Sequence, residues 1–199
     1  MKEEKKATWL GIIGNILLFV SKLIVGIAYN SIAIISDALN SFTDIIASFI
    51  VHLSVIISYG EPDKEHQFGH DRAQPIAALI VAIFIGIVGF EIIAASITRI
   101  LEGQRLEPGL FPVFLIAIVM IAKFVMYLYT NMIYKRTNSI ALKASTIDHR
   151  NDVLISFAVL LSIIISNFGY PIFDPLVGIV IGVWIIISGY NPNSDDYSY

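Results

Sequence analysis

The chain has 199 residues, of which 56% are hydrophobic and 15% are charged, and its mean hydropathy is +0.77. Soluble domains carry about 25% charged residues, so this composition excludes an ordinary soluble domain. The lack of cysteine excludes disulfide scaffolds, thiol catalysis and cysteine-ligated metals, and a net charge of −3 argues against a nucleic-acid partner. The sequence therefore predicts an integral membrane protein, with the lipid bilayer as its surroundings.

Six apolar segments are long enough to cross the hydrocarbon core, which requires about 20 residues of helix. In chain order they cover residues 7–29, 31–58, 74–100, 109–134, 139–168 and 172–190. Turn-like sequences separate them, such as Tyr29-Asn30-Ser31 between the first two. The alternating ten-residue segments of a membrane β-barrel are not evident. The predicted fold class is thus an all-α membrane protein with six transmembrane helices.

Lysine and arginine are distributed unevenly between the two sides of this arrangement. If the amino terminus is cytoplasmic, eight of the 13 basic residues lie on the cytoplasmic side and two, Arg99 and Arg105, lie on the other. The remaining three fall within or near the spans. This distribution predicts that both termini are cytoplasmic, and we expect the plasma membrane as the location.

Two of the spans contain charged residues that cannot face lipid. Residues 37–44 read DALNSFTD, and residues 148–152 read DHRND. A charged side chain near the bilayer centre costs roughly 2.5–3.5 kcal/mol on insertion scales. Because residues three and four apart share a helix face, the polar side chains form one stripe on each span. The two stripes are expected to face each other or a shared polar cavity.

The spacing predicts a metal site with an i, i+4 pair from each of these spans. An amide and three carboxylates are hard oxygen ligands that suit Mg²⁺, Ca²⁺ and Mn²⁺, whereas zinc commonly takes histidine or cysteine. No basic residue is expected to neutralise these acids, so a divalent cation is the natural counter-charge. Simple hydrogen bonding between neighbouring helices is the alternative. The predicted ligands are Asn40, Asp44, Asp148 and Asp152. The candidates to hold these ligands in position by contacting them, and not the ion, are Asp37, Ser41 and Ser145.

Other intramembrane residues have structural interpretations. A lone buried charge is expensive, so Lys22 on the first span is predicted to pair with Glu91 on the third. His149 lies about 100° round the helix from Asp148, so it is expected to face a neighbouring helix and not the site. Glycines in the third and sixth spans predict close contacts between helices.

In their order along the chain, these motifs resemble those of the cation diffusion facilitator family. Members are six-helix metal exporters whose second and fifth helices each give two ligands to a midplane site. NSFTD (40–44) and DHRND (148–152) occupy those positions, and EHQFGHDRAQPIAAL (65–79) and FDPLVGIVIG (173–182) look like the family's loop and sixth helix. Zinc exporters usually have histidine where this sequence has Asp148, so the set resembles the manganese branch.

The resemblance implies efflux of Mn²⁺, with Fe²⁺ as the other candidate, by alternating access and metal-for-proton antiport. It also implies a homodimer with no resident cofactor. The linker residues Asp63, His66 and His70 resemble a second metal site of some relatives, with a solvated loop as the alternative.

Family members usually continue into a cytoplasmic metal-binding domain with a ferredoxin-like fold. The expected organisation here is a cytoplasmic flank at residues 1–6, a transport domain at 7–190 and a polar tail at 191–199. We expect the additional domain to be missing, either because the chain is truncated or because it is a natural short form.

Two other functions fit parts of the pattern. Intramembrane prenyltransferases hold Mg²⁺ with Asn/Asp-rich motifs on two helices, but they need more than six helices and a basic pocket for the diphosphate. A passive divalent-cation channel could use an acidic ring. A four-ligand site between two helices of one subunit suits alternating access better than conduction. The sequence therefore favours a transporter over an enzyme.

Overall fold

The computed structural model describes residues 2–58, 73–103, 109–138 and 140–189. These ranges form six helices and contain no strand, which confirms the all-α prediction. Only the start of the first helix differs clearly from the predicted spans, because the Lys- and Glu-rich flank is itself helical. The helices are α1 (Lys2–Ala28), α2 (Ile32–Ser58), α3 (Ala73–Glu102), α4 (Leu110–Thr137), α5 (Ile140–Asn167) and α6 (Phe173–Gly189).

Residues in the left-handed backbone conformation follow the ends of four helices. Asn30 follows α1 and Asn138 follows α4, with φ angles of 53° and 52°. Gly103 follows α3 and Gly169 follows α5, with φ angles of 65° and 98°. Glycine and asparagine adopt this conformation most readily, and it stops a helix from continuing. The turn signals in the sequence thus mark real helix ends.

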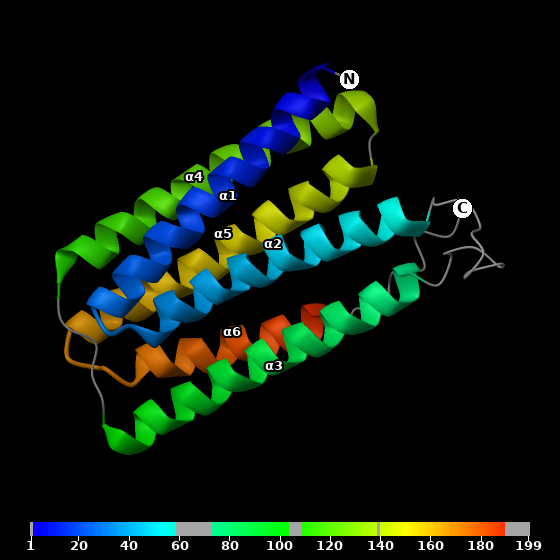
Figure 1. Cartoon of the computed structure of the whole chain (residues 1–199). Helices are drawn as coiled ribbons and strands as arrows, with labels where there is room; N and C mark the ends of the chain where they lie inside the picture. The colour runs from blue at the N-terminus through cyan, green and yellow to red at the C-terminus, as the bar shows by residue number, and fades with distance from the viewer. Residues whose placement is uncertain (1, 59–72, 104–108, 139, 190–199) are drawn as a thin grey trace.

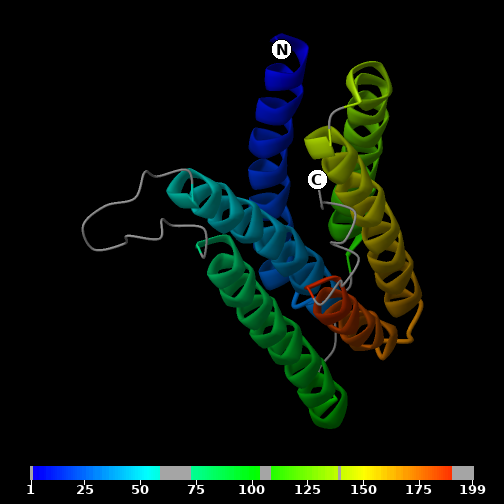
Figure 2. The same cartoon turned by 90° about the vertical axis from the view of Figure 1, so that its right-hand side faces the viewer.

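The helices lie side by side along one long direction and alternate in sense (Figure 1). Helix α5 packs along α4 and α6 packs along α3, while α2 contacts α1, α3, α5 and α6. Figure 2 shows α1, α4 and α5 separating from α2 and α3 toward the end of the bundle where α1 begins. We call this the first end, and the end where α2 begins the second end.

The outer surface of the bundle is strongly apolar. On α3 alone, Leu79, Ile83, Ile87 and Phe90 are 55–65% exposed. Soluble monomers rarely expose contiguous apolar patches larger than a few hundred Å². Parts of α2, α3, α4 and α5 are long and apolar enough to cross a membrane, and α1 and α6 carry shorter apolar stretches. The protein is therefore an integral membrane protein with several membrane-crossing helices.

Helices α3 and α6 approach each other closely at glycines, as the sequence predicts. A Cβ atom added at Gly182 would lie 2.9 Å from the carbonyl oxygen of Gly89 on the facing helix. A Cβ atom added at Gly89 would lie equally close to the carbonyl oxygen of Gly182. Small residues permit this backbone approach, which is a common basis of helix packing in membranes.

Gly182→Ala should therefore destabilise the protein by about 1–3 kcal/mol, because the added methyl group forces α3 and α6 apart. Thermal unfolding of the detergent-solubilised protein, followed by circular dichroism, measures the effect. Gly86→Ala on α3 is the matched control, since a Cβ atom there has no neighbour within 4 Å. Equal melting temperatures for the two variants would contradict this account of the contact.

Candidate metal site

A cavity of about 550 Å³ lies between α1, α2 and α5. Its lining begins near the middle of the bundle, at Asp44 and Asp152, and continues toward the first end, where Leu142 lies in the opening turns of α5. Apolar side chains from α1, α2 and α5 form most of the cavity wall. The polar lining residues are Asn15, Asp44, Ser48, Ser145, Asp148, His149 and Asp152.

The four predicted ligands lie near one another on α2 and α5, and three of them line the cavity. Asp44 and Asp148 are exposed to the cavity, whereas Asn40 and Asp152 are buried at 6% and 3% exposure. The Asn40 side-chain amide donates a hydrogen bond to Asp152 Oδ1 at 3.3 Å. Asp44 interacts electrostatically with both Asp148 and Asp152. Three acids from the two helices therefore line one cavity, whereas Asp37 of the α2 stripe does not.

One of the acids is already engaged by a cation. Lys123 on α4 donates hydrogen bonds to Asp152 Oδ2 and, at 2.7 Å, to Asn15 Oδ1. The lysine is only 1% exposed, so this ion pair is inside the bundle. The expectation that no basic residue neutralises the acids is thus wrong for Asp152, and it is also wrong for Asp37, which pairs with Lys22. Lys123 reaches Asp152 because α4 packs directly along α5.

Across the described residues, no three histidine, aspartate or glutamate side chains converge closely enough in this conformation to hold a metal ion. Asp44 and Asp148 project into the cavity while Asp152 is turned toward Lys123 and Asn40. An ion bound by all three carboxylates requires these side chains to turn toward one another.

A second buried ion pair lies beside the cavity. Lys22 Nζ donates to Asp37 Oδ1 at 2.9 Å and to Ser41 Oγ at 2.7 Å, and Asp37 Oδ2 accepts a hydrogen bond from Ser156 Oγ at 3.1 Å. Both charged side chains are 0% exposed. The predicted pairing of Lys22 with Glu91 is wrong, because Lys22 faces α2 and Glu91 lies on the exposed side of α3. Asp37 thus connects α2 to α1 through Lys22 and to α5 through Ser156, and Ser41 adds a second hydrogen bond to Lys22.

The remaining candidate, Ser145, lies in the cavity wall with its hydroxyl 3.4 Å from His149 Nε2. His149 also lines the cavity, although it is only 2% exposed. The expectation that His149 faces away from the site is wrong, because His149 lines the same cavity as its neighbour Asp148. Within the described part of the chain, His149 Nδ1 has no hydrogen-bond partner.

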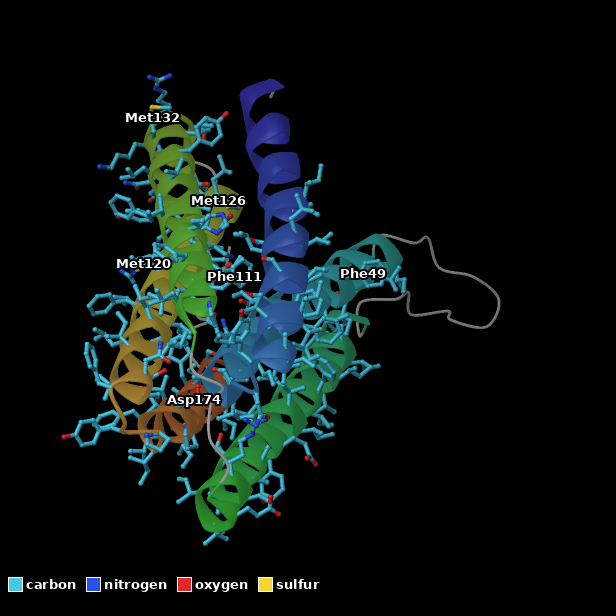
Figure 3. The ribbon with its side chains drawn as sticks, turned by 90° about the vertical axis from the view of Figure 1, so that its left-hand side faces the viewer. Phe49, Phe111, Met120, Met126, Met132 and Asp174 are labelled. Carbon is cyan, nitrogen blue, oxygen red and sulfur yellow. The ribbon has the colours of Figure 1, made fainter. Side chains whose placement is uncertain are left out.

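Hydrogen bonds between helices join the second end of the bundle. The Asp174 carboxylate at the start of α6 accepts hydrogen bonds from the Ser31 hydroxyl and from the Ile32 backbone N–H, the latter at 2.8 Å (Figure 3). The Asn167 side chain donates to the Gly109 carbonyl at 3.0 Å and accepts from its N–H at 3.3 Å. The cavity and these hydrogen bonds lie toward opposite ends of the bundle.

The predicted second site, formed by Asp63, His66 and His70, lies outside the described residues, as does the tail at 191–199. The domain boundaries and this second site stay predictions.

An all-helical bundle with an apolar surface and an acidic interior cavity defines a multi-pass integral membrane protein. Residues 8–198 match the model of the cation efflux transmembrane domain, and the chain belongs to this family. This confirms the resemblance that the motifs indicate. It also favours a transporter over the prenyltransferase alternative, because the family consists of transporters and not enzymes.

Individual relatives are similar over most of this chain. It is 32% identical to the uncharacterized transporter MJ0449 of Methanocaldococcus jannaschii, over 93% of this chain and 65% of the relative. It is 29% identical to the manganese efflux system protein MneS of Bacillus subtilis, over 93% and 64% of the two chains. It is 28% identical to the cation-efflux pump FieF of Pectobacterium atrosepticum, over 90% and 60%. The chain thus spans slightly less than two thirds of these relatives, whose prokaryotic sources are consistent with a plasma-membrane location.

Proposed function

We propose that this chain is the membrane part of a divalent metal efflux transporter, with Mn²⁺ as its main substrate. The observation that carries the proposal is the cavity between α1, α2 and α5, into which Asp44 and Asp148 project beside Asp152. Carboxylates inside a membrane protein are expensive unless they serve a cation or a proton. A cavity toward one end and hydrogen-bonded helices at the other suit one state of an alternating-access cycle.

In this proposal Asn40, Asp44, Asp148 and Asp152 bind the ion. Asp44 and Asp148 are exposed to the cavity, so they have room to change rotamer and meet Asp152. The four side chains supply only oxygen ligands, which favours Mn²⁺ or Fe²⁺ over Zn²⁺. The name of the Bacillus subtilis relative, a manganese efflux system protein, supports the same substrate.

The proposal also includes the orientation of the protein in the membrane and the coupling of metal transport to proton transport. With both termini in the cytoplasm, the cavity faces the cytoplasmic side, from which an exporter takes its substrate. Release on the other side requires the hydrogen bonds of Asp174 and Asn167 at the second end to separate. Protons then replace the metal on the carboxylates, which gives antiport. A homodimer, as the resemblance implies, is the proposed assembly.

Proteoliposomes that contain the purified full chain test this function. We expect saturable Mn²⁺ uptake, read from quenching of an internal metal-sensitive dye, with proton movement in the opposite direction read from a pH-sensitive dye. Competition among Mn²⁺, Fe²⁺, Zn²⁺ and Cd²⁺ should rank Mn²⁺ first. Fast, non-saturable flux without proton movement would indicate a channel instead, and no metal-dependent flux would contradict transport altogether.

A further inference from the structure

Among the described residues, two lysines are buried inside the bundle, and their charges are balanced in different ways. Lys22 forms its ion pair with Asp37, which does not line the cavity, so this pair is neutral by itself. Lys123 forms its ion pair with Asp152, which lines the cavity between α1, α2 and α5 and belongs to the proposed ligand set. Its other partner, Asn15, is also part of the cavity wall.

The charges around this cavity have a simple balance. Asp44, Asp148 and Asp152 contribute three negative charges when ionised, and the ammonium group of Lys123 contributes one positive charge. The remaining charge is −2, which one divalent cation neutralises. Without Lys123 the same cavity would carry −3, and one divalent ion would leave an unbalanced charge inside the membrane, where such a charge is costly.

We propose that Lys123 is the resident counter-cation of the metal site, and this rests on the proposed function. In the metal-free form its ammonium group holds Asp152. When an ion enters, the ammonium group leaves Asp152 and stays hydrogen-bonded to Asn15, whose side-chain oxygen already lies 2.7 Å away. The flexible four-carbon stem of lysine permits this short movement. The ion thereby gains the Asp152 oxygen, and the loaded site is neutral.

Two consequences follow from the repulsion between the ammonium group and the bound ion. Lys123 weakens metal binding, because the ion must displace it and then remains close to its charge. For the same reason Lys123 speeds release, since the ammonium group can return to Asp152 as the ion leaves. A transporter benefits from both effects, because an ion held too tightly is not released.

Lys123→Met removes the charge and keeps the length of the side chain. We expect the dissociation constant for Mn²⁺, measured by isothermal titration calorimetry in mildly alkaline buffer, to fall by at least about tenfold. The turnover of Mn²⁺ uptake in proteoliposomes should fall as well. The dissociation constant for Lu³⁺, a trivalent ion of similar size, should fall by a larger factor than that for Mn²⁺, because the repulsion from Lys123 scales with ion charge. Lys135→Met, an exposed position on the same helix, is the matched control and should leave all three quantities unchanged.

Asn15→Asp provides an independent route if Lys123→Met does not fold. This nearly isosteric change also takes the charge around the cavity from −2 to −3, and the new carboxylate competes with Asp152 for the ammonium group. It should likewise tighten Mn²⁺ binding by at least about tenfold. Weaker or unchanged binding in the folded variants, or equal factors for Mn²⁺ and Lu³⁺, would overturn the counter-cation role. If the unaltered chain neither binds nor transports Mn²⁺, it is the proposed function that fails.

Discussion

Asp148→Ala is expected to lower Mn²⁺ uptake into proteoliposomes by more than about 100-fold. Loss of a group behind a metal ligand already costs about 10–100-fold in metal affinity, and the loss of a ligand should cost more. The protein should still fold, because Asp148 projects into the cavity and its removal relieves repulsion with Asp152. Asp44→Ala should behave in the same way, since Asp44 shares both the exposure and the acidic neighbours.

Asp148→His tests whether the chemical type of the ligand at position 148 sets the metal preference. Imidazole is a softer ligand than carboxylate, so this variant should keep transport and shift its preference from Mn²⁺ toward Zn²⁺. Metal competition in the same vesicles measures the shift. Glu91→Ala is the matched control, because it removes a carboxylate from the exposed side of α3 and should leave uptake intact. Normal Mn²⁺ transport by Asp148→Ala would show that the ion binds elsewhere.

The helices of this protein are largely predictable from local sequence. Long, mostly apolar segments can satisfy their backbone in a bilayer only as helices, and asparagine or glycine at positions such as Asn30 and Gly169 ends them. The shared cavity also follows from the sequence, because two stripes of acids cannot both face lipid. In each case the constraint can be read from residues close together in the chain, namely the apolar segment, the turn residue or the acids of one helix.

The partners of the buried charges are harder to predict, although the distance of each charged residue from the nearest turn indicates them. Lys22 lies eight residues before Asn30, and Asp37 lies seven residues after it. Lys123 lies fifteen residues before Asn138, and Asp152 lies fourteen residues after it. Antiparallel helices rise by the same 1.5 Å or so per residue, so positions equally far from a tight turn lie at the same height. A pairing of Lys22 with Glu91 does not satisfy this register, because Glu91 lies on α3 and not on the helix that follows Asn30.

Other contacts depend on how helices far apart in the chain pack together. Asp174 reaches Ser31 and Ile32 only because α6 lies against the start of α2, and no spacing in the sequence fixes that contact. The place of His149 in the cavity wall depends on how α1, α2 and α5 together enclose the cavity. These features follow from tertiary packing and not from the pattern of any single helix.

Asp37→Ala should lower the free energy of unfolding by about 3–5 kcal/mol, the usual cost of leaving a buried charge without its partner. Lys22 has no exposed side-chain surface on which to regain water, and Ser156 loses its acceptor. Unfolding in mixed micelles with increasing sodium dodecyl sulfate measures the loss. The double variant with Lys22→Met should recover most of it, because no uncompensated ammonium group remains.

The double variant also decides whether Asp37 acts on the ion. In the structure Asp37 joins α1, α2 and α5 from outside the cavity, so Lys22→Met with Asp37→Ala should keep at least about half of the Mn²⁺ uptake once stability is regained. A stable double variant that cannot transport would instead give Asp37 a direct part behind the ligands. If the double variant is no more stable than Asp37→Ala alone, the ion pair is not what makes Asp37 necessary. We therefore expect the two buried pairs to have separate roles that can be measured separately, with Lys22–Asp37 acting on stability and Lys123–Asp152 on the ion.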